Sequence, residues 1–291
     1  MSVVRWTLPI AASLMVGACG TYVPEIQEVS AISETGQVES VGTSQRLVHA
    51  IVDSIHCELR NAVTDVIDED KKVAKLNPGG RRSAAWLDGW GAQIGLSLTT
   101  EEKTSLNPTV LWSPLSPLTT IFTLAGGGTL SSDATRIDKL GYLYTVRELY
   151  ALRKCPKDRI VENSKAPIGS LLIQSDLKLR EWLFDQTFNV GTGEYAVPTA
   201  ITTPLKQNVL SHEVKFEIVS TGTLAPAWKL KRVVINQSST LFSTTRDRTH
   251  DLVITFGPID PATKGLAGAA AAEYLASRIG DAIGNNVKTT Q

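Results

Sequence analysis

The chain has 291 residues with 29 basic and 29 acidic side chains, and 42% of its residues are hydrophobic. This composition is typical of a folded protein with an apolar core, and the balanced charge argues against a nucleic-acid partner. Three cysteines and four histidines argue against a metal-rich architecture, and we expect neither a metal nor a cofactor.

The N-terminal segment has the features of an export signal. Arg5 precedes an apolar stretch, residues 6–16, which is too short to span a bilayer comfortably. The run Val16-Gly17-Ala18-Cys19 follows, and it resembles the lipobox of bacterial lipoproteins: a branched apolar residue, two small residues and a cysteine. The alternatives are an ordinary secretory signal with a chance cysteine, or a buried N-terminal helix.

The resemblance implies a lipid anchor. In such lipoproteins a signal peptide, here residues 1–18, is cleaved before the cysteine, here Cys19, whose thiol carries a diacylglycerol and whose amine is usually acylated. Several acyl chains give firm attachment. Gly20 follows the cysteine where an aspartate would favour the inner membrane. We therefore expect outer-membrane anchoring, with the protein facing the periplasm or the cell surface.

Residues 19–42 are rich in Ser, Thr, Gly, Glu and Val without a clear period, which predicts a flexible tether. Residues 43–291 then form a globular α+β domain in our interpretation. Its first element is a long helix that Thr43 or Ser44 can cap. Apolar residues recur at every fourth position from Leu47 to Val63, and the run 77–80 (Asn-Pro-Gly-Gly) stops the helix.

After this helix the sequence pattern becomes typical of short strands. Apolar and polar residues alternate over 94–98, and the further strands expected in this block are 109–112, 119–124, 141–149 and 168–173. A helix is predicted to open at Ser175 or Asp176 and to run through Leu183. Residues 188–207 are expected to form a loop.

A second strand block follows, with strands predicted over 214–219, 227–235 and 251–256. An Ala/Gly-rich helix over 265–283 closes the chain. This helix is too short and too charged to cross a membrane. The expected fold is therefore α+β, with antiparallel meanders between a long N-terminal helix and a C-terminal helix.

The two strand blocks resemble each other. Residues 104–109 match 222–227 in outline, and 129–136 match 240–246 with one residue dropped. Units of about 86–150 and 210–257 would each form a small meander and pair as a sandwich or as one larger sheet. The alternative is a coincidence between two Thr/Ser-rich regions.

Two cysteines remain if Cys19 carries lipid. An exported protein meets an oxidising compartment, so we expect Cys57 and Cys155 to form a disulfide. Such a bridge would stabilise the fold by roughly 4 to 5 kcal/mol through the loop that it closes. The alternative is two separate buried thiols.

No catalytic motif is identifiable. The chain contains no G-x-S-x-G, H-E-x-x-H or C-x-x-C pattern. His49, Asp53 and His56 share one helix face and could hold a metal. Because no further ligand can be identified, we interpret them as a solvated polar face and predict no metal site.

The second strand block is locally basic. Lys229, Lys231, Arg246 and Arg248 are candidate ligand-binding residues that could contact anionic envelope polymers or lipid head groups; the alternative is a solvated strand face. The tryptophans could line a groove that stacks on glycans, or could be core and rim residues. These tryptophans are Trp86, Trp90, Trp112, Trp182 and Trp228.

The sequence thus predicts a lipid-anchored cell-envelope protein that acts as a structural or interaction module without a catalytic site. The partners expected are the membrane, through the N-terminal lipid, and an envelope protein or glycan. There are two alternative functions. One is an envelope glycan- or ligand-binding module, and the other is an exported hydrolase with a site built from scattered carboxylates.

Overall fold

A computed structural model describes residues 23–24, 26, 43–76, 79–80, 82–114, 123–156, 175–191, 209–225, 227–229, 233–236 and 240–288. The expected signal peptide, Cys19 and the expected strand 168–173 lie outside these residues. Of the expected tether, Val23, Pro24 and Ile26 are described, and Pro24 and Ile26 are buried.

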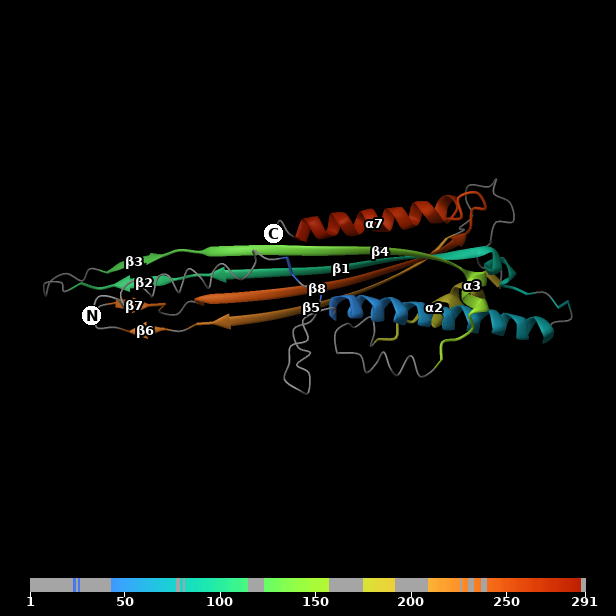
Figure 1. The fold of residues 1–291 in the computed structure, drawn as a ribbon, viewed down its shortest axis with the longest axis horizontal. Coiled ribbons are helices and arrows are strands. Elements are labelled where there is room, and N and C mark those ends of the chain that lie inside the picture. Colours follow the sequence, from blue (N-terminus) through green and yellow to red (C-terminus); the bar gives the residue numbers. More distant parts are fainter. Residues whose placement is uncertain are drawn as a thin grey trace. The chain divides into compact units, whose positions relative to one another are not determined.

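The fold is α+β, as predicted, with a long first helix and a helix at the end of the described chain (Figure 1). The helices are α2 (Thr43–Leu76), the 3-10 turn η1 (Ala85–Gly89), α3 (Val146–Ala151), α6 (Leu179–Gly191) and α7 (Gly268–Lys288). The strands are β1 (Trp90–Leu106), β2 (Thr109–Trp112), β3 (Leu124–Gly127), β4 (Leu130–Thr145), β5 (Leu210–Leu224), β6 (Trp228–Lys229), β7 (Val233–Ile235) and β8 (Phe242–Pro258).

The strands form two four-stranded sheets. The long strands have the order β4-β1-β8-β5, and the short strands have the order β3-β2-β7-β6. Each region expected as a repeat unit supplies one pair of long strands, β1 with β4 and β5 with β8. The two pairs meet side by side through β1 and β8. They therefore form one larger sheet. The sandwich, which was the other expected arrangement, is not formed by these strands.

The chain divides into two compact units. Unit 1 comprises residues 1–26, 98–138 and 217–249, and unit 2 comprises residues 27–97, 139–216 and 250–291. Each long strand contributes residues to both units. The five helical elements described above all belong to unit 2, whereas the regular elements described in unit 1 are strands.

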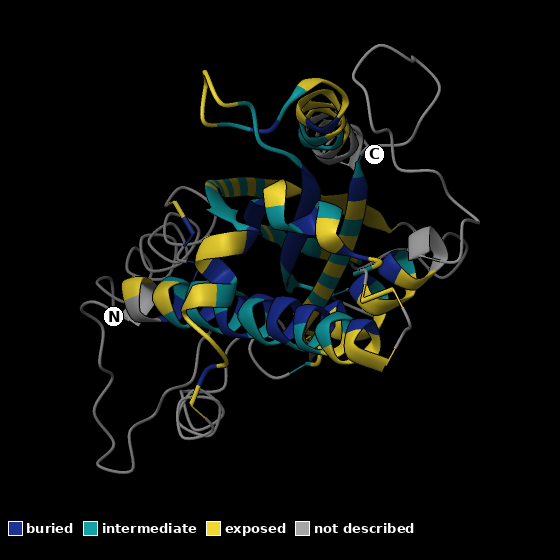
Figure 2. Ribbon diagram, turned by 90° about the vertical axis from the view of Figure 1, so that its right-hand side faces the viewer, coloured by how far each residue is buried: buried dark blue, intermediate teal, exposed yellow. Residues whose placement is uncertain are grey.

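Unit 2 has three layers, because strand side chains alternate between two helical covers. Ile94 and Leu96 line one small cavity together with Ile55 of α2. Gly95 faces the other way, since a Cβ added there would lie 3.0 Å from the ring of Tyr274 on α7. In Figures 1 and 2, α2 and α7 accordingly lie on opposite sides of this part of the sheet.

The long helix packs as its sequence predicts. The expected apolar stripe of α2 is buried, including Ile51 and Leu59, which are fully covered. Helix α6 lies against α2. Its Trp182 stacks near Phe256 of β8, with the two ring centres 5.9 Å apart. Unit 2 therefore owes its stability to burial of apolar side chains between helices and sheet.

Three predicted elements were wrong in part. The single strand expected over 227–235 is instead two strands, β6 and β7, that pair antiparallel. The strand expected over 141–149 ends at Thr145, and helix α3 follows. Thr145 and Glu148 form a capping box, in which the Glu148 amide donates to the Thr145 hydroxyl (3.1 Å) and the Thr145 amide donates to the Glu148 carboxylate (3.0 Å). This box starts a helix whose buried residues, Val146 and Leu149, are spaced three apart.

The helix expected from residue 175 or 176 begins later, at Leu179, and continues to Gly191, into the expected loop. The carboxylate of Asp176 accepts a hydrogen bond from the Lys178 amide (2.9 Å). Lys178 itself has a φ of 59°, which a right-handed helix does not allow. This local turn postpones the helix start.

The expected disulfide is confirmed. Cys57 of α2 is bonded to Cys155, which follows α3, with a Cα–Cα distance of 5.4 Å. Arg60 reinforces the same junction, since its guanidinium donates to the carbonyl oxygens of Leu152 (2.6 Å) and Arg153 (3.0 Å). The segment after α3 is therefore fixed to α2 by one covalent bond and several hydrogen bonds.

We predict that the double variant Cys57→Ala/Cys155→Ala loses about 4 kcal/mol of unfolding free energy, because the bridge closes a loop of nearly one hundred residues. Urea unfolding followed by far-ultraviolet circular dichroism measures this loss. A reducing agent should destabilise the native protein equally and leave the double variant unchanged. Equal stability of the native protein and the double variant under oxidising conditions would refute the prediction.

Candidate functional site

Unit 1 has almost no apolar core. Among its described residues, the buried apolar side chains are Ile26 and Leu98, beside the buried Pro24. Large apolar side chains instead face outward on its strands, and seven of them are 42% to 59% exposed: Val110, Trp112, Leu124, Leu130, Ile137, Val219 and Leu224. Clustered apolar exposure of this kind is characteristic of interaction surfaces.

On the described strands of unit 1, the charged residues lie on the long strands and on β6. Lys103 forms ion pairs with Glu101 and with Asp133 (3.5 Å), and Arg246 pairs with Glu102 (3.0 Å). Residues 104–132 then contain no Asp, Glu, Lys, Arg or His. We term residues 98–138 the first hairpin and residues 217–249 the second hairpin. In the second hairpin, residues 218–228 and 233–245 are also free of these residues. The charged residues within 218–245 are therefore Lys229, Lys231 and Arg232.

The short sheet at the end of both hairpins has one strongly apolar face. Trp112 is the register partner of Leu124 on one side and of Val233 on the other. Val110 likewise pairs with Gly126 and with Ile235. Because cross-strand partners share a face, Val110, Trp112, Leu124, Val233 and Ile235 form what we term the apolar face.

The opposite face of this short sheet is mixed. Thr109 pairs with Gly127, and Leu111 pairs with Ala125 and Val234. Lys229 takes the next register position beside Val234. The two faces therefore differ in degree: Leu111, Ala125 and Val234 share their face with Thr109 and Lys229, whereas every non-glycine residue of the apolar face is apolar.

The predicted basic cluster does not form an open cationic patch in its described part. Arg246 is engaged by Glu102, and Arg248 is only 8% exposed. Lys229 belongs to β6, but its side chain lies outside the described part of the structure, as does the whole of Lys231. Binding of a ligand by these four residues stays a prediction.

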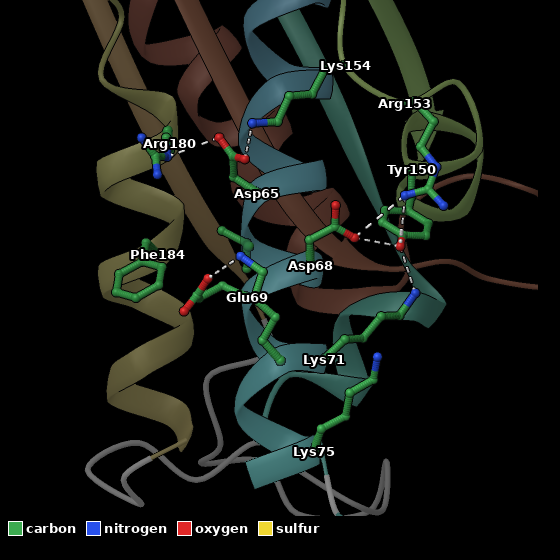
Figure 3. Close-up of a pocket in the computed structure, with 12 residues that line it drawn as sticks. Asp65, Asp68, Glu69, Lys71, Lys75, Tyr150, Arg153, Lys154, Arg180 and Phe184 are labelled. Atoms are coloured by element: carbon green, nitrogen blue, oxygen red, sulfur yellow. Dashed lines mark hydrogen bonds and ion pairs between the residues drawn. The ribbon is translucent and has the colours of Figure 1, made fainter.

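A second candidate site is a cavity of about 690 Å³ in unit 2, over helix α2 (Figure 3). Asp65 forms ion pairs there with Lys154 and with Arg180 (3.1 Å). The hydroxyl of Tyr150 donates to Asp68 (2.7 Å) and accepts from Lys71 (2.9 Å). These interactions join α2, α6 and the segment after α3 around one opening.

The cavity is cationic overall. Its lining includes the basic residues Lys71, Lys72, Lys75, Arg153, Lys154 and Arg180 and the acidic residues Asp65, Asp68 and Glu69. All three acidic side chains form ion pairs with basic ones, and six basic against three acidic residues leave an excess of three positive charges. This electrostatic field suits an anionic ligand. The lining offers no Ser, Cys or His nucleophile for covalent chemistry.

The other candidates are dispersed. His49 lies 3.4 Å from Asp53, whereas the ring of His56 stacks on Tyr144 at 4.7 Å. No group of three potential metal ligands occurs among the described residues. The tryptophans are also separate: Trp86 contacts Trp90, Trp182 is packed against His212 and Phe256, and Trp112 belongs to the apolar face.

Glu58 of α2 is a titrating group that the sequence did not single out. Burial is the main cause that raises the pKa of its carboxyl to about 7, and the negative charge of Asp176 adds to this effect. Hydrogen bonds from the backbone of Leu177 and Leu179 oppose it. The pKa of Asp176 is lowered, chiefly by the Lys178 amide. Only the tertiary packing of the 175–179 segment on α2 creates this environment, so no sequence pattern marks it.

No protein-family model matches this chain, and no curated protein matches its sequence. None of the helices in the described ranges combines the length and apolarity needed to cross a bilayer. The features that bear on function are therefore the apolar face, the cavity over α2 and the N-terminal sequence.

We predict that Glu58→Gln makes stability less sensitive to pH. The raised pKa means that the folded state holds the Glu58 proton more tightly than the unfolded state does. This stabilisation is complete below about pH 4.5 and is lost as pH rises through 7. The Tm of Glu58→Gln minus that of the native protein should therefore increase by several degrees between pH 5 and pH 8.

Glu69→Gln is the matched control, because Glu69 is an exposed carboxylate on the same helix. Its Tm difference from the native protein should stay flat over this pH range. Thermal unfolding at half-unit pH intervals provides the measurement. Parallel curves for the two variants would show that Glu58 has no special coupling to folding.

Proposed function

We propose that this protein is a lipid-anchored cell-envelope component that acts as an interaction module rather than as an enzyme. The observation that carries the proposal is the apolar face: a set of exposed apolar side chains on a unit with almost no core of its own. Burial of such a surface against a partner lowers the free energy of the system.

The N-terminal sequence supports the membrane part of the proposal. The run Val16-Gly17-Ala18-Cys19 fits a lipid-attachment signal, and Gly20 favours the outer membrane. Val23, which belongs to unit 1, is the fourth residue after Cys19, so their Cα atoms are at most roughly 14 Å apart. A lipid on Cys19 would thus hold the start of unit 1 close to the bilayer.

Labelling with an alkyne analogue of palmitate tests the anchor. Cells that make the native chain should incorporate the label into it, and Cys19→Ser should abolish the labelling because the acceptor thiol is gone. Gly20→Ala is the control, since it changes a neighbouring residue and keeps the thiol. Continued labelling of Cys19→Ser would contradict the proposed anchor.

A specific observation also favours binding of an anionic envelope glycan as a second function. The cavity over α2 carries six basic and three acidic side chains from the end of α2, the segment after α3 and the start of α6. Lys72 and Lys75 lie on the last turns of α2 and are strongly exposed. Lys72 is paired with Glu69 (3.1 Å), and neither lysine takes part in the ion pairs of Asp65.

For this function we predict that Lys72→Glu/Lys75→Glu weakens binding of a fluorescent heparin oligosaccharide, used as an anionic glycan probe, by at least fivefold. The double variant inverts the field where the cavity opens. Lys139→Glu/Lys215→Glu changes the net charge equally on exposed strand positions and should leave the affinity unchanged. Equal weakening by both variants, or by neither, would exclude the cavity as the binding site.

A further inference from the structure

We propose that the two hairpin ends of unit 1 insert into a lipid bilayer, with the apolar face toward the acyl chains and with copies of the chain paired along their open strand edges. The inference rests on the proposed function, because it names the bilayer as the partner of the apolar face.

The first argument is the distribution of charge. A membrane-crossing strand needs about 9 to 11 residues without charges that face lipid. The two arms of the first hairpin, 104–114 and 123–132, each meet this length. So do the two arms of the second hairpin, 218–228 and 233–245. Four adjacent arms of this length and composition match the thickness of a bilayer core.

The second argument is the geometry of the apolar face. Its residues stand in two rows across the strand order β3-β2-β7-β6, so the face is continuous over the sheet. Val110, Trp112 and Leu124 are at least 42% exposed although they are apolar. Trp228 takes the register position beside Ile235. Tryptophan is favoured where acyl chains meet head groups.

The third observation is the sign of the charges in residues 229–232. The charges of the second hairpin's end are Lys229, Lys231 and Arg232, which are all basic. Basic side chains at the end of an apolar arm can reach anionic head groups, which attract them. The expected contact of Lys229 and Lys231 with lipid head groups fits this position in the chain.

The fourth argument explains why several copies take part. The outer strands are β3 and β6 in the short sheet and β4 and β5 in the long sheet. Backbone groups on such edges cannot stay unpaired in lipid. A second copy offers the complementary edge, β5 and β6 against β4 and β3. Repeated head-to-tail pairing of this kind closes into a ring, with the mixed face turned away from lipid.

The place of the anchor agrees with this arrangement. Val23, Pro24 and Ile26 belong to unit 1, the unit that carries the apolar face. A lipid on Cys19 therefore tethers the hairpin-bearing unit itself, which raises the local concentration of the apolar face at the bilayer surface.

Adjacent residues of β2 test the proposal. Val110→Cys and Leu111→Cys are made separately in the full chain with Cys19→Ser behind an ordinary cleaved secretory leader, so that no lipid is attached. Each protein is labelled with an environment-sensitive fluorophore and is reconstituted from detergent into phosphatidylethanolamine–phosphatidylglycerol vesicles. Val110 belongs to the apolar face and Leu111 to the mixed face, so the two variants control each other.

We expect a nitroxide-labelled lipid to quench the fluorophore at position 110 at least threefold more than that at 111, and aqueous iodide to show the opposite preference. Strong iodide quenching at both positions, without lipid quenching, would overturn the proposal and leave the apolar face to a protein partner. Equal lipid quenching at both positions would overturn the assignment of faces.

The outcome is separable from that of the anchor test, because these variants carry no lipid. Loss of the 110/111 contrast with intact palmitate labelling of the native chain would refute insertion and leave the anchor in place. A clear contrast without palmitate labelling would refute the anchor and leave insertion in place.

Discussion

The removal of apolar side chains from water is the constraint on which the two units depend, and they meet it differently. Unit 2 places its apolar residues between α2, α6, α7 and the sheet, where each fully buried Leu, Ile or Phe contributes roughly 1.5 to 3 kcal/mol. Unit 1 buries Ile26 and Leu98 and leaves the apolar face exposed in its described part. The described part of unit 1 therefore leaves apolar surface in contact with water, which the proposed partner would cover.

The four long strands, β1, β4, β5 and β8, contribute residues to both units. In unit 2, β1 presents Ile94 and Leu96 to α2 and keeps Gly95 small so that α7 can approach. In unit 1, the residues of this strand between Leu98 and Leu106 are Thr, Glu, Lys and Ser, and Lys103 and Arg246 form ion pairs with its glutamates. The disulfide between Cys57 and Cys155 fixes the segment after α3 to α2 within unit 2.

Sequence patterns predicted the elements whose signal is local. The period of α2, the alternation in β1, β5 and β8, and strand β2 were all visible, as was the cysteine pair in an exported chain. Helix α3 was not predicted because Thr145 and Glu148, which form its capping box, lie within the run 141–149 that was interpreted as a strand. The joining of β1 to β8 and the environment of Glu58 arise from tertiary contacts that no local pattern encodes. The apolar face could have been sought from the charge-free stretch 104–132, but its register, which sets Trp112 beside Leu124 and Val233, required the structure.

Hydrogen–deuterium exchange with and without lipid vesicles tests most directly whether the exposed hairpin ends are built for a bilayer. The account predicts that peptides covering 104–132 and 218–245 exchange quickly in water and become strongly protected when vesicles are present, whereas peptides of α2 and β8 in unit 2 stay protected throughout. Unchanged exchange of both hairpin ends on addition of vesicles would contradict the account.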